Sequence, residues 1–459
     1  MALKIGTGIT IGGGITFSPV LGPVTANLVL NLDALDYSGS GTTWPATVGP
    51  DATLYNGVTW TDSGPGYFTF SPDSLQFADT PNIGNLNNWT VECWFKLTSD
   101  FTAYAFPALV TTVYELDGGI NYGNINYTLS TYPYNTGLTN GYYNGTPGQG
   151  WFNTPTFAPT VGDWYQMIGT FDGTTLKTYI NGIEISSAAG GAPSIANGGG
   201  IRIARRWDGD GQAQYFAPAE ISVVRIYNTA LNAIQVARNF DALRLRFALP
   251  LPALITSGLI QNLDAGDTDS YSGSGGTWTD LSGAGNDASL QGYAPWTDAG
   301  DQSYFVFSTG YADSGNILPN TAYTKIGIFK VTGNYQNLMS GDNNQHAFWG
   351  FGTQYLQSGH NANWATVVSP VTTPLNQWVF GAVTFDNTTG WKLYLNDNTP
   401  VTNGSTDQFT DNPALVQIGA YGGANNLNGE VAVSLIYNRA LSEAEMAQNF
   451  AYYQARFGF

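Results

Sequence analysis

Charge, cysteine and histidine are all scarce in this chain of 459 residues. Charged residues make up 10% of the sequence, Cys93 is the one cysteine, and His346 and His360 are the two histidines. A single cysteine cannot form a disulfide within its own chain, and we interpret Cys93, inside the apolar run WTVECWFKL, as a buried small hydrophobe. The histidine count excludes a histidine-rich metal site or a Ser-His-Asp triad from the first half of the chain. His360 stands among polar residues, in QSGHNANW, and we expect it on the surface, with a glycan or ligand contact as the alternative.

Long apolar runs and basic residues are also missing. No stretch of about 18 uninterrupted apolar residues exists, which excludes a transmembrane helix. The start, MALKIGTGITIGGGITFSPV, is interrupted by glycines and lacks the continuous apolar segment of a signal peptide, which argues against simple secretion. There are 33 acidic against 15 basic residues, a formal net charge of -18. Such a surface repels phosphate backbones and anionic lipids, so we expect no nucleic-acid partner.

What the chain does contain is glycine and aromatic residues: 57 Gly, 27 Tyr, 24 Phe and 13 Trp. Together with the low charge, this composition is typical of β-rich proteins, because a protein of long helices would need more Glu, Lys and Arg. The length is enough for two or three domains, each with a full core.

An internal repeat decides the architecture, because three blocks recur in the same order in both halves. The first is NLDALDYSGSGTTW (31–44) against NLDAGDTDSYSGSGGTW (262–278). The second is WYQMIGTFDGTTLKTYING (164–182) against WVFGAVTFDNTTGWKLYLNDN (378–398), and both copies predict strand, tight turn, strand.

The third block aligns without a gap over 27 residues, 221–247 against 431–457. A strand is predicted to end at Tyr227 and at Tyr437, and a helix to begin at an N-cap, Asn232 or Ser442. Each N-cap is followed three positions later by Gln or Glu, the capping-box arrangement. Each repeat therefore closes with one helix.

These boundaries predict an N-terminal glycine-rich arm (1–24), a first domain (25–248), a proline-containing linker (249–254) and a second domain (255–459). The first domain carries a Tyr/Asn/Gly-rich insertion near 114–155, which we interpret as long surface loops or a β-ribbon. In the arm, Ile9 and Ile11, then Ile15 and Phe17, alternate with small or polar residues. We expect an extended arm that adds a strand to another subunit, with a disordered tail as the alternative.

The endings IYNTALNAIQVARNF (226–240) and IYNRALSEAEMAQNF (436–450) resemble the laminin-G-like, concanavalin-A-like jelly-roll superfamily, and the Trp-strand and Phe-Asp-turn hairpins fit it too. The resemblance implies an all-β fold of two tandem jelly-roll sandwiches, each closing with a short helix. It leaves function open, because this fold hosts lectins, adhesion modules, hydrolases and viral surface proteins. An acidic pair common in the family is replaced here by Ser222-Val223 and Ala432-Val433, and we interpret Glu220 and Glu430 nearby as solvated strand ends.

Catalysis and metal binding have weak candidates. Glycosidases on this fold need two carboxylates facing one cleft, and the nearest motif, ELDGGI (115–120), has Glu115 and Asp117 but Ile120 in the third place. We therefore expect no enzyme and no cofactor. The family resemblance implies calcium as a candidate ligand of Asp208 and Asp210 in WDGDGQ (207–212), with an ordinary acidic turn as the alternative.

Aromatic loop residues are the candidates for stacking on sugar rings, with packing or a subunit interface as the alternative. The candidate glycan contacts are Tyr132, Tyr134, Tyr142, Tyr143, Trp151, Trp349 and Trp364. Trp164 and Trp378 begin strands at matching places of the two repeats, and we expect them in the cores. Recognition is expected mainly in the insertion, because loops carry specificity on a rigid sandwich.

The signal-free start, the arm and the jelly rolls together resemble virion proteins of tailed bacteriophages. That resemblance implies a structural or adhesive surface protein, a capsid decoration or a fibre, located on the virion and released by host lysis. Its partners would be other virion subunits through the arm, copies of itself in a homo-oligomer, and cell-surface glycans. A host carbohydrate-binding lectin is the alternative, and a glycoside hydrolase is a distant third.

Deleting residues 2–20 should leave both domains folded and abolish assembly, because the alternating arm leaves backbone donors and acceptors that need a partner strand. Thermal unfolding and size in solution measure the two effects. Normal assembly of the truncated protein would make the arm a mere tail.

Overall fold

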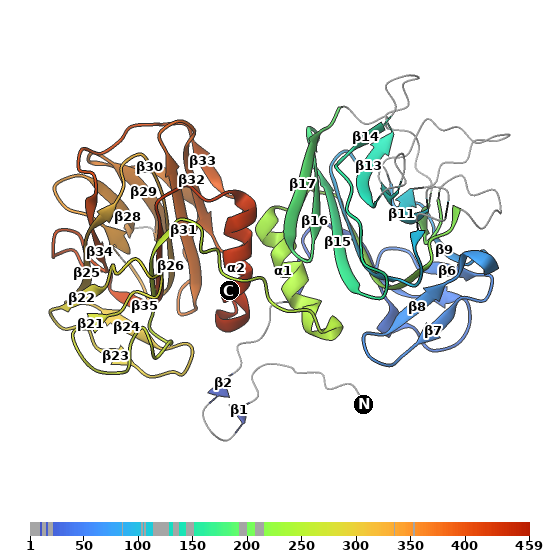
Figure 1. The fold of residues 1–459 in the computed structure, drawn as a ribbon, viewed down its shortest axis with the longest axis horizontal. Helices are drawn as coiled ribbons and strands as arrows, with labels where there is room; N and C mark the ends of the chain where they lie inside the picture. The colour runs from blue at the N-terminus through green and yellow to red at the C-terminus, as the bar shows by residue number, and fades with distance from the viewer. Residues whose placement is uncertain are drawn as a thin grey trace. The chain divides into compact units, whose positions relative to one another are not determined.

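The computed structural model describes most of the chain. The described residues are 10–11, 15–16, 22–84, 86–101, 104, 107–112, 128–131, 137–143, 151–191, 200–206, 215–334, 336–351 and 354–459. They form two compact units, which we call unit one (Gly22–Leu251) and unit two (Pro252–Phe459). In Figure 1, unit one runs from blue to green and unit two from yellow to red. In the arm, the described strands β1 (Thr10–Ile11) and β2 (Ile15–Thr16) pair with each other.

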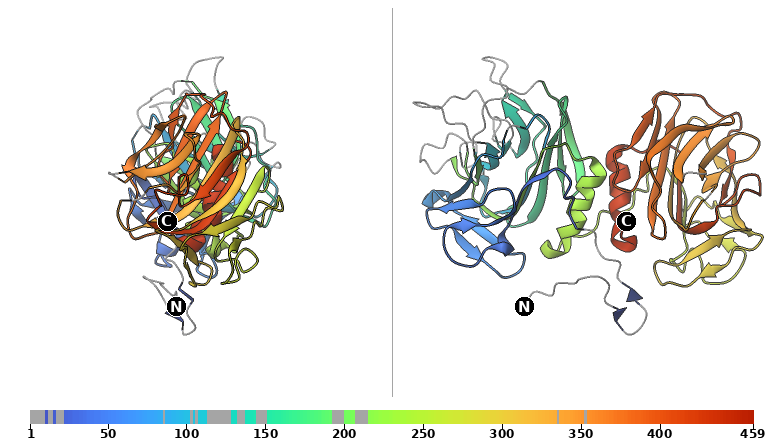
Figure 2. Two further views of the ribbon diagram at one scale, coloured as in Figure 1. Left: turned by 90° about the vertical axis from the view of Figure 1, so that its left-hand side faces the viewer. Right: turned by 180° about the vertical axis from the view of Figure 1, so that it is seen from behind.

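Unit one is built from two antiparallel sheets (Figures 1 and 2). The first has the order β17-β16-β15-β10-β19-β3-β5, with β7 and β8 joined to it through β19. Its strands are β3 (Leu28–Asp33), β5 (Ala46–Val48), β7 (Thr59–Thr61), β8 (Tyr67–Phe70), β10 (Trp89–Leu97), β15 (Trp164–Phe171), β16 (Thr175–Ile180), β17 (Ile183–Ala189) and β19 (Ala219–Tyr227). The second has the order β14-β13-β12-β11-β18-β9-β6-β4. Its strands are β4 (Thr43–Trp44), β6 (Ala52–Tyr55), β9 (Phe77–Thr80), β11 (Ala108–Thr112), β12 (Thr128–Ser130), β13 (Thr139–Tyr143), β14 (Trp151–Asn153) and β18 (Ile201–Ile203).

Unit two repeats the plan with three sheets. The largest has the order β23-β24-β35-β26-β31-β32-β33, and β20 joins it through β35; the others are β21-β22-β25-β34-β27 and β28-β29-β30. The strands of the largest are β20 (Leu259–Asp264), β23 (Trp296–Thr297), β24 (Tyr304–Phe307), β26 (Ala322–Val331), β31 (Val379–Asp386), β32 (Gly390–Leu395), β33 (Val401–Asn403) and β35 (Gly429–Tyr437). The remaining strands are β21 (Thr277–Trp278), β22 (Ala288–Gln291), β25 (Tyr311–Leu318), β27 (Met339–Ser340), β28 (His346–Phe351), β29 (Tyr355–His360), β30 (Asn363–Thr372) and β34 (Ala414–Ile418).

Each unit closes with the helix that its sequence predicts. These are α1 (Ala233–Arg244) and α2 (Glu443–Phe457), and short 3-10 turns occur at Ala34–Asp36, Pro72–Ser74 and Leu245–Phe247. The predicted N-caps, Asn232 and Ser442, both form complete capping boxes. The predicted all-β class and the strand ends at Tyr227 and Tyr437 are confirmed. Neither helix in the described part of the chain is long and apolar enough to cross a membrane.

Strand β10 shows how alternation builds two apolar layers at once. Val91, Cys93 and Phe95 point into the core between the two sheets of unit one, and all are fully buried. Trp94, on the opposite face, packs under α1 and its 3-10 extension, where Phe240 and Phe247 stack on its ring. The strand is therefore buried on both faces, and the prediction that Cys93 is a buried residue is confirmed. Burial raises the pKa of the Cys93 thiol, which keeps the thiol protonated at neutral pH.

A buried asparagine ties the start of each unit to its last strand and its helix. Asn239 of α1 donates to the Tyr227 hydroxyl at 2.9 Å and accepts from the backbone N–H of Val24 at 2.8 Å. The Tyr227 hydroxyl donates to the carbonyl oxygen of the same Val24 at 3.0 Å. Unit two repeats these contacts with Asn449, Tyr437 and Ile255 at matching positions. We call this arrangement the closing network.

Two ion pairs are repeated as well. Glu220 pairs with Lys96 at 2.5 Å, and Glu430 pairs with Lys330 at 2.5 Å. Both glutamates lie at the beginning of their strands, as expected, but they are ion-paired and only partly exposed, so they are not simply solvated. The second pair, Asp33 with Arg246 in unit one, has its counterpart in Asp264 with Arg456. The second pair joins β3 to the 3-10 turn that follows α1 in unit one, and it joins β20 to the last turn of α2 in unit two.

The closing networks differ in one contact, which gives a testable difference. Asn239 also donates to the Glu92 carboxylate at 2.8 Å, whereas unit two has Ile326 at the matching position. Asn449→Ala should destabilise unit two by about 2–4 kcal/mol, and Asn239→Ala should cost unit one more, because a buried carboxylate loses a donor. Denaturant unfolding of the separately expressed units measures both costs. A smaller loss for Asn239→Ala would contradict this account of the network.

Candidate functional site

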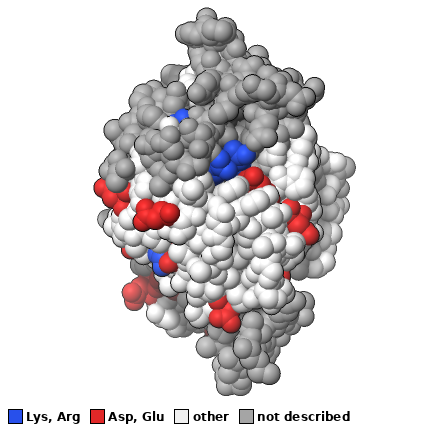
Figure 3. Space-filling view, turned by 90° about the vertical axis from the view of Figure 1, so that its right-hand side faces the viewer, with Lys and Arg blue, Asp and Glu red and all other residues white. Residues whose placement is uncertain are grey.

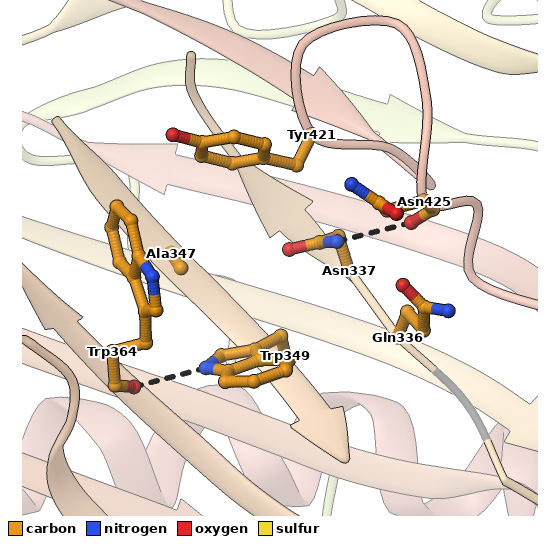
Figure 4. Close-up of a pocket in the computed structure, with 7 residues that line it drawn as sticks. All are labelled: Gln336, Asn337, Ala347, Trp349, Trp364, Tyr421 and Asn425. Atoms are coloured by element: carbon orange, nitrogen blue, oxygen red, sulfur yellow. Dashed lines mark hydrogen bonds between the residues drawn. The ribbon is translucent and has the colours of Figure 1, made fainter. Parts of the chain in front are cut away.

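A hollow of about 250 Å³ in unit two brings three aromatic rings and three amide side chains together. Its lining residues are Gln336, Asn337, Ala347, Trp349, Trp364, Tyr421 and Asn425. Figure 4 shows the rings of Trp349, Trp364 and Tyr421 around one side of the hollow and the amides of Gln336, Asn337 and Asn425 around the other. We call this hollow the aromatic-amide site.

The aromatic side is fixed by contacts between two strands and a loop. Trp349 lies on β28 and Trp364 on β30, the outer strands of the three-stranded sheet. The Trp349 indole N–H donates to the carbonyl oxygen of Trp364 at 2.9 Å. Tyr421, from the loop between β34 and β35, meets the Trp364 ring edge to face, with centroids 5.5 Å apart. The Tyr421 hydroxyl accepts from the backbone N–H of Asn344 at 2.7 Å, which holds the ring in place.

The amide side contains one structural residue and two open ones. Asn337 is buried, its amide donates to the carbonyl oxygen of Asn425 at 3.0 Å, and its carbonyl accepts from the Ser340 hydroxyl at 2.8 Å. Gln336 is half-buried and Asn425 is exposed. Within the described residues, neither of these two side chains is used in a hydrogen bond, so both amides line the hollow with unused donors and acceptors.

Charge is absent from the lining. None of the described lining residues is Asp, Glu, Lys, Arg or His. In the described part of the chain, no three His, Cys, Asp or Glu side chains gather closely enough to hold a metal ion. Figure 3 shows the side of the molecule formed by unit one, where uncharged residues cover most of the described surface, with scattered Asp and Glu and a small patch of Lys and Arg. The site can therefore recognise a ligand by stacking and by neutral hydrogen bonds.

A family model described as the concanavalin A-like lectin/glucanases superfamily matches residues 70–237 and again 274–447. The chain belongs to this superfamily. In both repeats the match covers the second block and most of the third, so the resemblance of the two endings to laminin-G-like domains is confirmed. No curated protein sequence matches the chain significantly.

Solved structures overlap the chain only loosely. Trypanosoma rangeli sialidase is 17% identical with a TM-score of 0.36, over 51% of this chain and 36% of the sialidase. Domain 4 of an extracellular arabinanase from Geobacillus stearothermophilus, in complex with arabinotriose, is 17% identical with a TM-score of 0.34, over 46% of this chain and 96% of that domain. The binding domain of botulinum neurotoxin serotype D/C is 11% identical with a TM-score of 0.38, over 93% of this chain and 97% of that domain. The chain thus spans about a third of the sialidase, and these overlaps define no shared function.

Of the seven candidate glycan contacts, the structure brings Trp349 and Trp364 together in one site. Trp151 is half-buried at the start of β14. Tyr143 lies on β13 opposite Trp151, but its side chain is outside what the structure describes. Tyr132 and Tyr134 lie outside the described residues, as do the candidate calcium ligands Asp208 and Asp210 and the acids Glu115 and Asp117.

Tyr142 requires a correction. Its side chain is fully buried, its ring stacks on Phe152, and its hydroxyl is hydrogen-bonded to Gly191. Burial also raises the pKa of the Tyr142 hydroxyl. Tyr142 therefore packs the second sheet of unit one and has no face for a sugar. Around it, β12, β13 and β14 form a ribbon that extends this sheet. A β-ribbon was one of the two interpretations of the insertion, and long surface loops were the other.

His360 and the paired tryptophans also differ from expectation. His360 is 3% exposed, between Tyr323 and the loop at Asp407, so its expected surface position is wrong. The polar residues around it in sequence sit at a turn, while its own ring points inward. Trp164 and Trp378 are half-buried outside the sandwich cores, packed against Phe247 and Phe457 and beside the cations of Lys96 and Lys330.

Sequence reasoning missed Gln336, Asn337, Tyr421 and Asn425. Tyr421 and Asn425 lie in AYGGANN (420–426), a glycine-rich segment without charged residues. The signal that could have found this loop is its one aromatic residue, Tyr421, beside two glycines. Gly422 and Gly423 have positive φ and permit the tight turn that carries the ring. Gln336 and Asn337 carried no pattern that would have separated them from other polar loop residues.

Single substitutions should separate the structural amide from the open one. Asn337→Ala should destabilise unit two by about 1–3 kcal/mol, because it removes two buried hydrogen bonds. Gln336→Ala should change stability by less than about 0.5 kcal/mol, since its amide supports nothing within the described residues. Thermal unfolding compares the two, and equal losses would show that Gln336 is also structural.

Proposed function

We propose that this protein is a non-enzymatic carbohydrate-binding protein and that the aromatic-amide site of unit two receives an uncharged sugar. One observation carries the proposal: Trp349, Trp364 and Tyr421 converge on a hollow that also exposes the unused amides of Gln336 and Asn425. Membership of the concanavalin A-like lectin/glucanases superfamily supports it, because that superfamily includes lectins.

The chemistry of a sugar matches the two sides of the site. A pyranose ring has apolar C–H faces that pack on aromatic rings, and its hydroxyls exchange hydrogen bonds with amides. Small-molecule pockets commonly begin near ~300 Å³, so a hollow of about 250 Å³ suits one end of a glycan better than a long chain.

The charges of unit two favour a neutral ligand. From Pro252 to Phe459 there are five Lys and Arg against sixteen Asp and Glu, a difference of -11. Four of the five cations form ion pairs with carboxylates, and the fifth is buried: the pairs are Lys330–Glu430, Lys392–Glu443, Arg439–Glu445 and Arg456–Asp264, and the buried cation is Lys325. A sialic acid or a sulfated sugar would therefore find no free cation and would be repelled.

The absence of carboxylates from the described lining supports binding in preference to hydrolysis. A glycosidase needs an acid and a second carboxylate on either side of the scissile bond. Where Trp349 and Trp364 hold a sugar, amides are the polar groups within reach. We therefore propose no enzymatic activity for this site.

A location on a virion, as a capsid decoration or fibre, is a second part of the proposal and rests on the arm and the composition. Binding of a surface glycan by an outward-facing unit would serve such a particle in adhesion. Mass spectrometry of purified particles tests it. Absence of the protein from any particle would leave the lectin of a cell as the remaining interpretation.

The binding site itself is tested by titrating the protein with maltotriose, cellotriose, triacetylchitotriose and 3′-sialyllactose. At least one of the three neutral sugars should bind, and 3′-sialyllactose should bind at least about tenfold more weakly, a difference of ~1.4 kcal/mol. Trp364→Ala and Tyr421→Ala should each weaken binding by about tenfold or more.

Tyr293→Ala provides the matched control, because Tyr293 belongs to unit two, is 70% exposed and lies outside the site. It should leave affinity unchanged. Preferred binding of the sialylated sugar, or equal losses in Tyr293→Ala and Tyr421→Ala, would refute the proposed site.

A further inference from the structure

A cluster of basic side chains is buried in the core of unit two. Lys325 of β26 and His346 of β28 are fully buried, and His360 of β29 is 3% exposed. Tyr323, also of β26 and fully buried, completes the group. We call these four residues the buried basic cluster. His346 and His360 are register partners on β28 and β29, so the cluster spans neighbouring strands.

Hydrogen bonds fix both histidines in the neutral form. Nε2 of His346 lies 2.8 Å from the carbonyl oxygen of Leu415, and because a carbonyl can only accept, this nitrogen carries the proton. Nδ1 of His346 then accepts from the Lys325 amine at 2.7 Å, which also donates to the carbonyl oxygen of Met339 at 3.1 Å. A second proton on His346 would point directly at the Lys325 amine.

His360 follows the same logic. Its Nδ1 lies 2.7 Å from the carbonyl oxygen of Asp407 and therefore donates, which leaves Nε2 to accept from the Tyr323 hydroxyl at 2.8 Å. Phe385, Trp391 and Phe409 pack against the ring. His360 also lines a small hollow of about 130 Å³ together with Trp391, Ser405 and Asp407.

No carboxylate compensates this group. Within the described residues, no Asp or Glu side chain bonds to any of the four, and the carboxylate of exposed Asp407 accepts from Ser405 instead. The groups that face the cluster are otherwise the backbone carbonyls of Met339, Leu415 and Asp407. Burial lowers the pKa of His360 to about 3, and it lowers the pKa of His346 and of Lys325 well below their ordinary values. For His346, the neighbouring Lys325 adds to this effect.

The cluster is connected to the aromatic-amide site through β27 and β28. The Met339 carbonyl that Lys325 holds belongs to β27, and the next residue, Ser340, donates to the side chain of Asn337 in the site. Ser340 also accepts from the backbone N–H of Phe348, the residue before Trp349. His346 begins the strand β28 that carries Trp349. Any rearrangement that lets water reach His346 thus loosens both sides of the site.

We propose that the buried basic cluster makes the aromatic-amide site acid-sensitive, so that unit two holds its sugar at neutral pH and releases it near pH 5. This inference rests on the proposed function, since it concerns the regulation of the same site. The cluster need not contact the sugar itself, because protonation acts on β28, which carries Trp349, and on β27, whose Ser340 bonds to Asn337.

The direction follows from proton uptake. A histidine exposed by opening has an ordinary pKa near ~6.5, whereas the closed form keeps His346 and His360 neutral far below that value. At pH values between the lowered histidine pKa values of the closed form and about 6.5, the open form binds more protons. The closed form therefore loses stability as the pH falls below about 6.5. Each histidine favours the open form by roughly 30-fold at about pH 5.

Unit one provides a matched internal control. It has no histidine, and Val91 occupies the position of Lys325, since Val91 pairs with Ile226 as Lys325 pairs with Ile436. The same chain therefore carries one sandwich with the device and one without it.

Hydrogen exchange of the full chain at about pH 7.5 and about pH 5, corrected for the intrinsic effect of pH on amide exchange, tests the inference. Amides of residues 338–349 should lose protection by about tenfold or more at the lower pH, and the amides of β10 and β19 in unit one should not. Affinity for whichever of maltotriose, cellotriose and triacetylchitotriose binds at about pH 7.5 should fall by a similar factor.

His346→Gln should flatten the pH response of these amides, because glutamine can keep neutral hydrogen bonds and cannot be protonated, and it should leave affinity at about pH 7.5 within threefold. His360→Gln is the second variant if His346→Gln does not fold. Unchanged protection of residues 338–349, or the same loss in unit one, would overturn the acid-sensitive device. Failure of all three sugars to bind at about pH 7.5 would overturn the proposed function and leave the exchange result to decide the device alone.

Discussion

The closing network is the interaction on which the rest of each unit depends. One buried asparagine on the helix joins the entering backbone, at Val24 or Ile255, to the hydroxyl of the tyrosine that ends the last strand. That strand is β19 or β35, and it pairs with the long buried strand β10 or β26. The network therefore holds the helix and the entering chain against the central strands of each unit. Because both units keep it, loops and inserted strands elsewhere are free to differ, which is where recognition is found on such scaffolds.

The two units bury charged side chains on opposite faces of their equivalent sheets, the ones that contain β10 and β26. In unit one, Glu92 lies under α1 and accepts from Trp94, Gln166, Arg225 and Asn239. At the matching places unit two has Ile326, Phe380 and Leu435, so these positions under α2 are apolar. A buried charged residue of unit two, Lys325, lies one residue earlier on β26 and therefore on the inner face with the histidines. Unit two therefore has a titratable group on the inner face of its sheet, connected to the aromatic-amide site through β27 and β28.

Sequence patterns predicted the parts of this structure that depend on neighbours in the chain. The capping boxes at Asn232 and Ser442 and the strand ends at Tyr227 and Tyr437 follow from local rules. Trp349 and Trp364 could be singled out as aromatic residues among polar ones, but their meeting with Tyr421 could not, since the loop returns some sixty residues later by a path that only the sheet order sets. His360 was misjudged for a related reason: a polar stretch predicts a turn, yet the first residue of a turn still belongs to its strand and can point into the core.

The central claim is that unit two receives an uncharged sugar between its aromatic rings and its open amides. A crystal structure grown with the tightest-binding neutral trisaccharide tests it most directly. The account predicts a sugar ring packed on Trp349 or Trp364, with hydroxyls within about 3.2 Å of the amides of Gln336 and Asn425. A sugar bound elsewhere on the chain, with this hollow holding only water, would contradict it.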